Sequence, residues 1–252
     1  MISVAHGLPP LTESGRRRRN AAVLVGLGLL LCAGCEEELG SPPLPPDGPS
    51  AVRACVTAHG ELIADLDDDG RADRVADPTG QGVDLTITFA AGSAHENKAG
   101  PRALADHAGE HQNYVRVAVA DFDRDGWSDL VVVAGRNQAG DDPVPPELAE
   151  LRLGPFSNTG RGQKTVRLDL GPTRNIAVAD YDHDRHPDLA AYTYTGDGTY
   201  ATQARLGESA RGLGPDTGEF TVEDTDHGSP ERLPHTGLAP FYPACRPDDT
   251  TG

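Results

Sequence analysis

The stretch DFDRDGWSD at residues 121–129 decides how this chain is interpreted, because the sequence contains three versions of it. The first version is DLDDDGRAD at residues 65–73, and the third is DYDHDRHPD at residues 180–188. We name these segments loop 1 (65–73), loop 2 (121–129) and loop 3 (180–188). Each has aspartates at positions 1, 3, 5 and 9, and the first aspartates are 56 and 59 residues apart. A regular spacing of this size predicts a protein built from repeats.

The density of carboxylates in each loop favours a bound metal ion. Like charges about 5 Å apart repel by roughly a few kcal/mol at an effective dielectric constant near 20, and a divalent cation removes that cost. One such run would be equally compatible with a solvated acidic turn, but three at a steady period favour the metal. Ligands that are all oxygen, on a flexible loop, favour Ca²⁺ over Zn²⁺, copper or Mg²⁺.

The segments around the loops predict strands. Apolar and β-branched residues precede the loops at 62–64, 115–120 and 176–179, and follow them at 74–76, 130–133 and 189–194. An EF-hand would need a glutamate at position 12, where this chain has Ala76, Val132 and Ala191. The repeated unit is therefore a strand, a metal-binding loop and a second strand.

Residues 63–75, 117–133 and 177–190 resemble the FG-GAP/VCBS-type repeat of integrin-α-like β-propellers. The resemblance implies an all-β fold, specifically a short or partial β-propeller whose blades have four antiparallel strands. Further strand candidates bring the expected total to about three four-stranded blades: 83–90, 151–153, 166–170, 201–206 and 220–222. The sequence leaves open a short propeller, an open array of blades, or one part of an oligomeric ring.

The same resemblance implies that Ca²⁺ is the cofactor, bound by the side chains at positions 1, 3, 5 and 9 and the backbone carbonyl at position 7. The implied ligands are Asp65, Asp67, Asp69, Arg71 and Asp73 in loop 1, Asp121, Asp123, Asp125, Trp127 and Asp129 in loop 2, and Asp180, Asp182, Asp184, His186 and Asp188 in loop 3. Loop 3 departs from the pattern because Arg185 replaces the glycine at position 6. A non-glycine residue in a left-handed conformation costs about 1–2 kcal/mol, so we expect this site to be the weakest.

The N-terminal region predicts export and a lipid anchor. A run of four arginines at 16–19 precedes twelve mostly apolar residues at 21–32, too short to span a bilayer and typical of a signal peptide. The run ends in LCAGC at 31–35, which resembles a bacterial lipobox with Cys35 as the lipidated residue. Ordinary secretion and an uncleaved anchor are the alternatives. We expect a lipoprotein of the bacterial cell envelope.

The sequence predicts four parts of the chain: a lipoprotein signal peptide at 1–34, a lipidated cysteine and proline-rich disordered tether at 35–50, the repeat domain at 51–245, and a disordered tail at 246–252. Cys55 and Cys245 bracket the repeat domain and form a natural disulfide pair in an oxidising compartment; two unpaired thiols are the alternative.

The net charge of −17 argues against nucleic acid and anionic lipid as partners, so contact with the membrane is expected only through the lipid.

Few other residues indicate a catalytic or metal-binding site. The segment HAGEH at 107–111 fits a zinc-peptidase pattern, but its central glycine weakens the helix that such a site needs, and an exposed polar loop is expected over 95–112. A degenerate fourth loop is considered at 223–228. We expect Phe122 to pack between blades, and Trp127 to be either an exposed contact residue or a cap over loop 2.

The expected function is a non-catalytic, calcium-binding adhesion or binding module with an unidentified protein or carbohydrate ligand. An envelope enzyme acting on polysaccharide and a purely structural subunit of an envelope complex are the alternatives.

Overall fold

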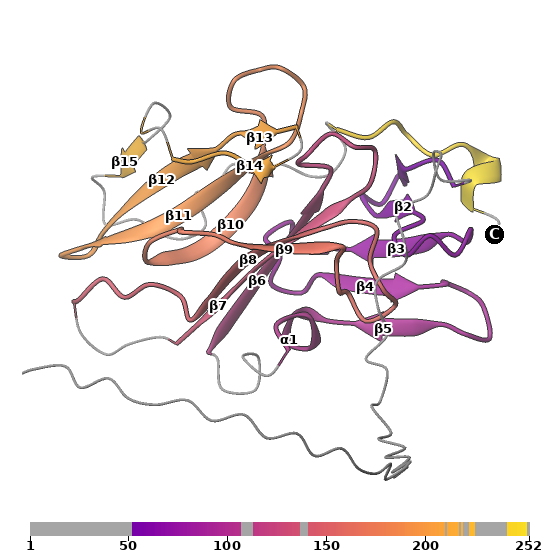
Figure 1. The fold of residues 1–252 in the computed structure, drawn as a ribbon, viewed down its shortest axis with the longest axis horizontal. Coiled ribbons are helices and arrows are strands. Elements are labelled where there is room, and N and C mark those ends of the chain that lie inside the picture. The colour runs from indigo at the N-terminus through magenta and orange to yellow at the C-terminus, as the bar shows by residue number, and fades with distance from the viewer. Residues whose placement is uncertain are drawn as a thin grey trace, which may run out of the picture. The chain divides into compact units, whose positions relative to one another are not determined.

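The computed structural model describes residues 52–106, 113–136, 141–209, 211–216, 218, 222–224 and 241–250. The described residues form an all-β fold of antiparallel sheets, as predicted (Figure 1). The expected signal peptide and tether, including Cys35, lie outside these residues. Within the described part of the chain, no helix has the length and apolar character needed to cross a bilayer.

Three sheets make up most of the fold. Sheet 1 contains β1 (Cys55–Val56), β2 (Leu62–Ala64), β3 (Asp73–Ala76), β4 (Thr86–Phe89) and β5 (Asn97–Ala99). Sheet 2 contains β6 (Tyr114–Ala120), β7 (Asp129–Gly135), β8 (Leu148–Leu153) and β9 (Lys164–Arg167). Sheet 3 contains β10 (Thr173–Ala179), β11 (Asp188–Gly196), β12 (Thr199–Arg205) and β15 (Val222–Asp224), and a separate short hairpin joins β13 (Gly207–Glu208) to β14 (Gly212–Leu213).

Each Asp-rich loop joins two adjacent antiparallel strands of its sheet. Loop 1 joins β2 to β3, loop 2 joins β6 to β7, and loop 3 joins β10 to β11. The register is also the same, because the residue before each loop pairs with the aspartate at position 9: Ala64 with Asp73, Ala120 with Asp129, and Ala179 with Asp188. The predicted unit of strand, loop and strand is therefore confirmed in all three repeats.

The core lies between the sheets, and alternation along the strands explains it. Residues 115, 117 and 119 of β6 pack with sheet 1, whereas Ala118 and Ala120 face the other way and pack with Ile176 and Val178 of sheet 3. Successive side chains of a strand point to opposite faces, so sheet 2 buries both faces (Figure 1). Phe122, the second residue of loop 2, is fully buried in the cluster shared by sheets 2 and 3, as expected.

The disulfide between Cys55 and Cys245 is present, with Cα atoms 4.8 Å apart and a sequence separation of 190 positions. It fastens the C-terminal segment beside β1. The N–H of Val56 donates to the carbonyl of Pro243 at 2.8 Å, and the N–H of Cys245 donates to the carbonyl of Val56 at 2.9 Å. The first and last described segments therefore lie side by side.

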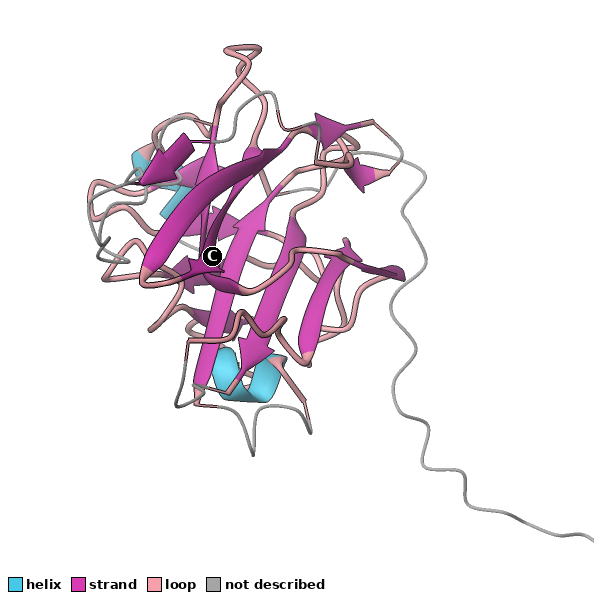
Figure 2. Cartoon of the chain, turned by 90° about the vertical axis from the view of Figure 1, so that its left-hand side faces the viewer, coloured by secondary structure: helices cyan, strands magenta, loops and turns pink. Residues whose placement is uncertain are grey.

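Two short segments differ from the sequence-based expectation. The polar insert contains β5 and a one-turn helix, α1 (Pro101–Leu104), where an exposed loop was predicted (Figure 2). Leu104 explains the helix, because it is fully buried in the core between sheets 1 and 2. The tail predicted to be disordered contains a 3₁₀ helix at Pro247–Thr250, where the N–H of Arg246 donates to Asp249 Oδ2 at 2.7 Å.

Candidate metal sites

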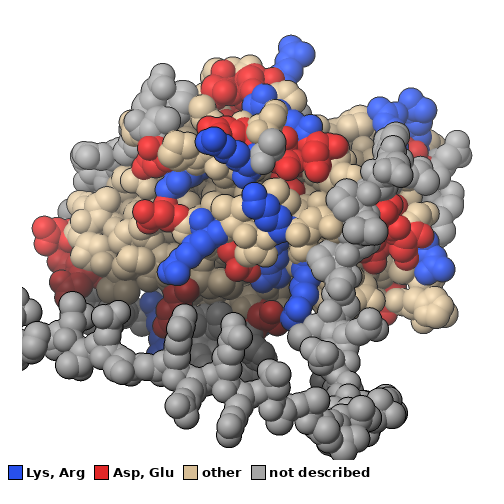
Figure 3. Space-filling model, viewed as in Figure 1, with Lys and Arg blue, Asp and Glu red and all other residues tan. Residues whose placement is uncertain are grey.

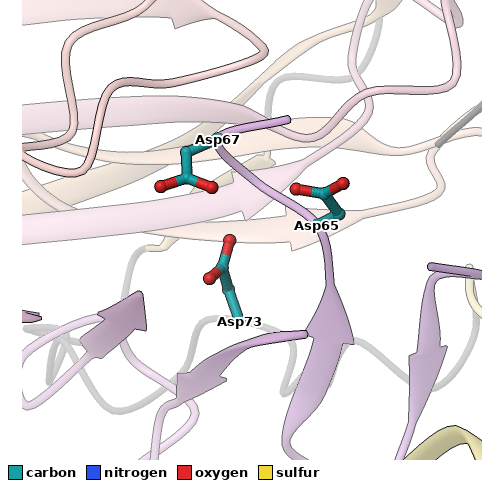
Figure 4. A group of neighbouring side chains, drawn as sticks. All are labelled: Asp65, Asp67 and Asp73. Atoms are coloured by element: carbon teal, nitrogen blue, oxygen red, sulfur yellow. The ribbon is translucent and has the colours of Figure 1, made fainter. Parts of the chain in front are cut away.

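Three carboxylates converge in each loop. The aspartates at positions 1, 3 and 9 each offer an oxygen, and these oxygens all lie within 4.8 Å of one another. Figure 4 shows the side chains of loop 1 pointing toward one another, with Asp65 following β2 and Asp73 beginning β3. The three groups are Asp65, Asp67 and Asp73, then Asp121, Asp123 and Asp129, then Asp180, Asp182 and Asp188.

In loops 1 and 2, the backbone folds back on the first aspartate. In loop 2, Asp121 accepts hydrogen bonds from the N–H groups of Asp125 and Gly126, both at 3.1 Å. Loop 1 repeats this pattern, with Asp65 accepting from the N–H groups of positions 5 and 6 at 3.1 Å. These bonds bend the chain into a tight turn, and the turn brings positions 1 and 3 onto one side.

Two positions of every loop adopt positive φ angles. Position 6 does so at Gly70, Gly126 and Arg185, with φ of 77°, 94° and 69°. Position 4 also does so, at Asp68, Arg124 and His183, with φ of 58°, 63° and 61°. The sequence indicated position 6 through its glycines, but nothing at position 4 indicated the same geometry. Aspartate and histidine tolerate this region better than arginine does.

The aspartate at position 9 ties its loop to the rest of the sheet. Asp129 accepts from the N–H of Phe122 at 2.9 Å through Oδ2 and from the N–H of Gly154 at 3.0 Å through Oδ1. The other two loops make equivalent bonds. Asp73 accepts from Leu66 and Ala90, and Asp188 accepts from Tyr181 and Gly207. The aspartate at position 9 therefore supports the fold and also belongs to the set of three converging carboxylates.

Burial and neighbouring carboxylates raise the pKa values of the aspartates at positions 3 and 9 of loops 1 and 2. Burial raises the pKa of Asp129 to about 8, and the nearby charge of Asp123 adds to the effect. Burial likewise raises the pKa of Asp73 to about 7. At position 3, burial and then the carboxylate of Asp69 raise the pKa of Asp67 to about 6, and burial and then Asp125 raise that of Asp123 to about 6. In the absence of a cation, these sites hold protons more strongly than ordinary aspartates do.

The residues present fit a divalent cation. The Oδ1 atoms of Asp67 and Asp180 are buried and have no hydrogen-bond partner among the described residues. A buried acceptor without a partner is costly, and a cation bound between positions 1, 3 and 9 would satisfy it. All of the donor atoms are oxygens, the set that suits hard cations such as Ca²⁺ and Mg²⁺.

The structure places the remaining predicted ligands differently. The position-5 aspartates, Asp69, Asp125 and Asp184, are not members of the three converging groups. Each instead accepts a hydrogen bond at 2.8 Å from the N–H at position 7. Metal binding by position 5, and by the carbonyls of Arg71, Trp127 and His186, stays a prediction.

Loop 3 departs from the other two loops in several ways. Arg185 takes the strained backbone angle that its place in the pattern led us to expect. Asp184 is also held by a neighbour, because Arg124 of loop 2 lies 2.5 Å from its Oδ2. Burial alone would raise the pKa of Asp184, but the hydrogen bond from His186 and the guanidinium of Arg124 outweigh burial and lower it.

The C-terminal segment also supports loop 2. The N–H of Asp121 donates to the phenol oxygen of Tyr242 at 3.2 Å, and the hydroxyl of Ser128 lies 3.4 Å from the same oxygen. Burial raises the pKa of Tyr242 to about 12, so its hydroxyl stays protonated. No local pattern indicated this contact, because the two residues that it joins are 121 positions apart.

Trp127 is buried, with 8% of its surface exposed, which excludes the expectation of an exposed contact residue. Its Cβ is close to Gly154, where an added Cβ would lie 3.1 Å from it. Trp127 therefore lies beside the connection that follows β8.

Two weaker sequence patterns gain no support. The HAGEH segment at 107–111 lies outside the described residues. In the degenerate fourth loop, Glu223 and Asp224 belong to β15, and residues 225–228 lie outside the described part of the chain.

Comparison with known proteins leaves the chain without an assigned family. A scan against protein-family models found no match, and a search of curated proteins found no relative.

Proposed function

We propose that this protein is a calcium-stabilised binding module whose three Asp-rich loops hold Ca²⁺ outside the cytoplasm. The observation that carries the proposal is that positions 1, 3 and 9 converge in all three loops. The same register and the same position-9 hydrogen bonds recur in each repeat. A solvated acidic turn would have no reason to bring the same three carboxylates together in every repeat.

In this proposal, the three sheets correspond to blades of a partial β-propeller. Support comes from the meandering order of strands in each sheet, from the position of each loop between two adjacent strands, and from packing of sheet 2 against both neighbours. The FG-GAP/VCBS-type resemblance of the loops supports the same interpretation. The cation would neutralise crowded carboxylates and hold the ends of two adjacent strands together.

A melting experiment tests the proposed role of calcium. We expect the purified chain to melt at a higher temperature in millimolar CaCl₂ than in EGTA, because a ligand that binds only the folded state stabilises it. MgCl₂ at the same concentration is the control for ionic strength and for cation selectivity. Equal melting temperatures in CaCl₂ and EGTA would contradict the proposal.

We also propose that the protein is anchored to the bacterial envelope through a lipid on Cys35, and that it presents its surface to a protein or carbohydrate ligand. Acidic and basic side chains are interspersed on the face shown in Figure 3. Partition in Triton X-114 tests the anchor. Wild type is expected in the detergent phase and Cys35→Ser in the aqueous phase, whereas wild type in the aqueous phase would refute the anchor.

A further inference from the structure

One arginine connects loop 2 to loop 3. Arg124, at position 4 of loop 2, places its Nη2 2.5 Å from Oδ2 of Asp184 in loop 3 and donates a hydrogen bond to the carbonyl of Gly207 at 3.1 Å. The side chains of Arg124 and Asp184 are 27% and 32% exposed, so the pair is partly shielded from water. The N–H of Gly207 donates to Asp188 at 2.8 Å. The guanidinium therefore contacts position 5 of loop 3 and the residue, Gly207, whose N–H binds position 9.

This contact leaves Asp184 in a different state from its counterparts. Its Oδ1 accepts from the N–H of His186 at 2.8 Å, and its Oδ2 is paired with Arg124. In loop 1, the equivalent Asp69 lies 3.6 Å from Arg71, whose side chain is 53% exposed. In loop 2, the equivalent Asp125 has no arginine or lysine within ion-pair distance among the described residues. Within the described part of the chain, loop 3 alone has its position-5 carboxylate paired with a close, partly buried arginine side chain.

We propose that Arg124 is a tethered competitor for the third metal site, which a divalent cation fills only by displacing the guanidinium from Asp184. This inference rests on the proposed function of the loops and on the predicted role of the position-5 carboxylate as a further metal ligand. A Ca²⁺ ion approaches its ligand oxygens to about 2.3–2.6 Å, and a guanidinium on the same carboxylate repels it at close range. The arginine also offsets the crowded charge of loop 3 when metal is absent. Loops 1 and 2 therefore fill first, and loop 3 depends less on calcium for its stability.

Calorimetric titration of the full chain with CaCl₂ tests this competition. In wild type, we expect two tighter sites and one weaker site. Arg124→Gln removes the charge but keeps most of the side chain, and it should tighten the weakest site by roughly three- to tenfold, the scale of a partly shielded ion pair. Arg71→Gln is the matched control, because it removes an arginine that faces the position-5 carboxylate of loop 1 at a longer distance. It should change each affinity less than about twofold, by roughly the effect of an exposed pair.

A second measurement separates competition from mere support of loop 3. Arg124→Lys keeps a cation and should leave the third site weak, and in metal-free buffer Arg124→Gln should melt at a lower temperature than either wild type or Arg124→Lys. In wild type, the NMR signal of the Arg124 guanidinium should shift with the third equivalent of calcium and not with the first two. This measurement requires no variant to fold.

The outcomes are distinguishable. The competition would be overturned if the affinity of the third site fell or stayed unchanged in Arg124→Gln. It would also be overturned if the guanidinium signal did not shift with the third equivalent of calcium. Either result would leave calcium binding by loops 1 and 2 intact. Absence of calcium binding by any loop in wild type would overturn the proposed function and this inference together.

Discussion

Oδ1 of Asp129 accepts a hydrogen bond from the N–H of Gly154 at 3.0 Å, and this bond joins the end of loop 2 to the connection that follows β8. Oδ2 of the same side chain accepts from the N–H of Phe122 at 2.9 Å at the start of the loop. One carboxylate thus joins three segments of sheet 2. Substitution of the aspartate at position 9 should therefore lower the free energy of unfolding more than substitution of the aspartate at position 3.

The first prediction separates these two roles. Asp129→Asn replaces one acceptor oxygen with a donor that faces a backbone N–H, so it should destabilise the fold by about 1–3 kcal/mol even without metal. Asp123 lies in the same loop and accepts a hydrogen bond from the N–H of Asp125, two residues away, so Asp123→Asn should cost little stability in EGTA and mainly reduce the gain in stability from calcium. Urea unfolding of both variants in EGTA and in CaCl₂ checks this. Equal losses in EGTA would contradict it.

The second prediction concerns pH. The pKa of Asp129 is raised from 3.8 to about 8 in the folded protein and that of Asp73 to about 7, both through burial first. The folded state binds these protons more tightly than the unfolded state does. The stability that the folded state gains from binding these protons is fully present below about pH 4, and it is lost as the pH rises through about 7 to 8.

Metal-free protein should therefore lose stability between about pH 5 and pH 8. Calcium needs the deprotonated carboxylates, so the increase in melting temperature on adding it should be larger near pH 8 than near pH 5. Melting curves at both values, with and without calcium, measure the difference. A calcium effect that is larger at the lower pH would contradict the raised pKa values.

The third prediction concerns the backbone of loop 3. Arg185 has a φ of 69°, and relief of left-handed strain is worth about 1–2 kcal/mol, partly offset by the greater freedom of glycine in the unfolded chain. Because this strain is present without metal, Arg185→Gly should raise the melting temperature in both EGTA and calcium. Arg185→Ala is the control, since it removes the charge but keeps a Cβ. If alanine stabilises as much as glycine, charge rather than backbone strain explains the effect.

The fourth prediction concerns the disulfide. It closes a loop of 190 residues, so its loss costs at most about 5 kcal/mol by chain entropy. Replacing Cys55 and Cys245 together by serine should also loosen the nearby contact between Tyr242 and Asp121, and so lower the affinity of loop 2 for calcium. Denaturant unfolding and calcium titration of the double variant measure the two effects. Unchanged stability would show that the hydrogen bonds of Val56 suffice to hold the C-terminal segment.

Much of this architecture could be predicted because its signals are local in the sequence. The strands flanking the loops and the burial of Phe122 follow from alternation and spacing. The pairing of Cys55 with Cys245, which are 190 positions apart, is an exception, and it was predicted because these cysteines bracket the repeat domain. The helix at Pro101–Leu104 was missed because one buried leucine, not a periodic pattern, holds it in place.

The candidate sites were predicted in part, for a similar reason. The convergence of positions 1, 3 and 9 is local and was visible in the sequence. The bond from Gly154 to Asp129, the contact of Tyr242 with loop 2 and the ion pair of Arg124 with Asp184 join residues 25, 121 and 60 positions apart. Such contacts depend on how the sheets pack, and a linear pattern does not contain that information.

The most direct test of the central claim is the amount of calcium bound per chain, measured by equilibrium dialysis of wild type and of Asp67→Asn, Asp123→Asn and Asp182→Asn. Each variant removes the position-3 carboxylate of one loop. We expect wild type to bind three ions at saturation, one for each converging group, and each variant to bind one fewer while remaining folded by circular dichroism. A wild type that binds no calcium, or variants that bind as much as wild type, would contradict the assignment of these loops as metal sites.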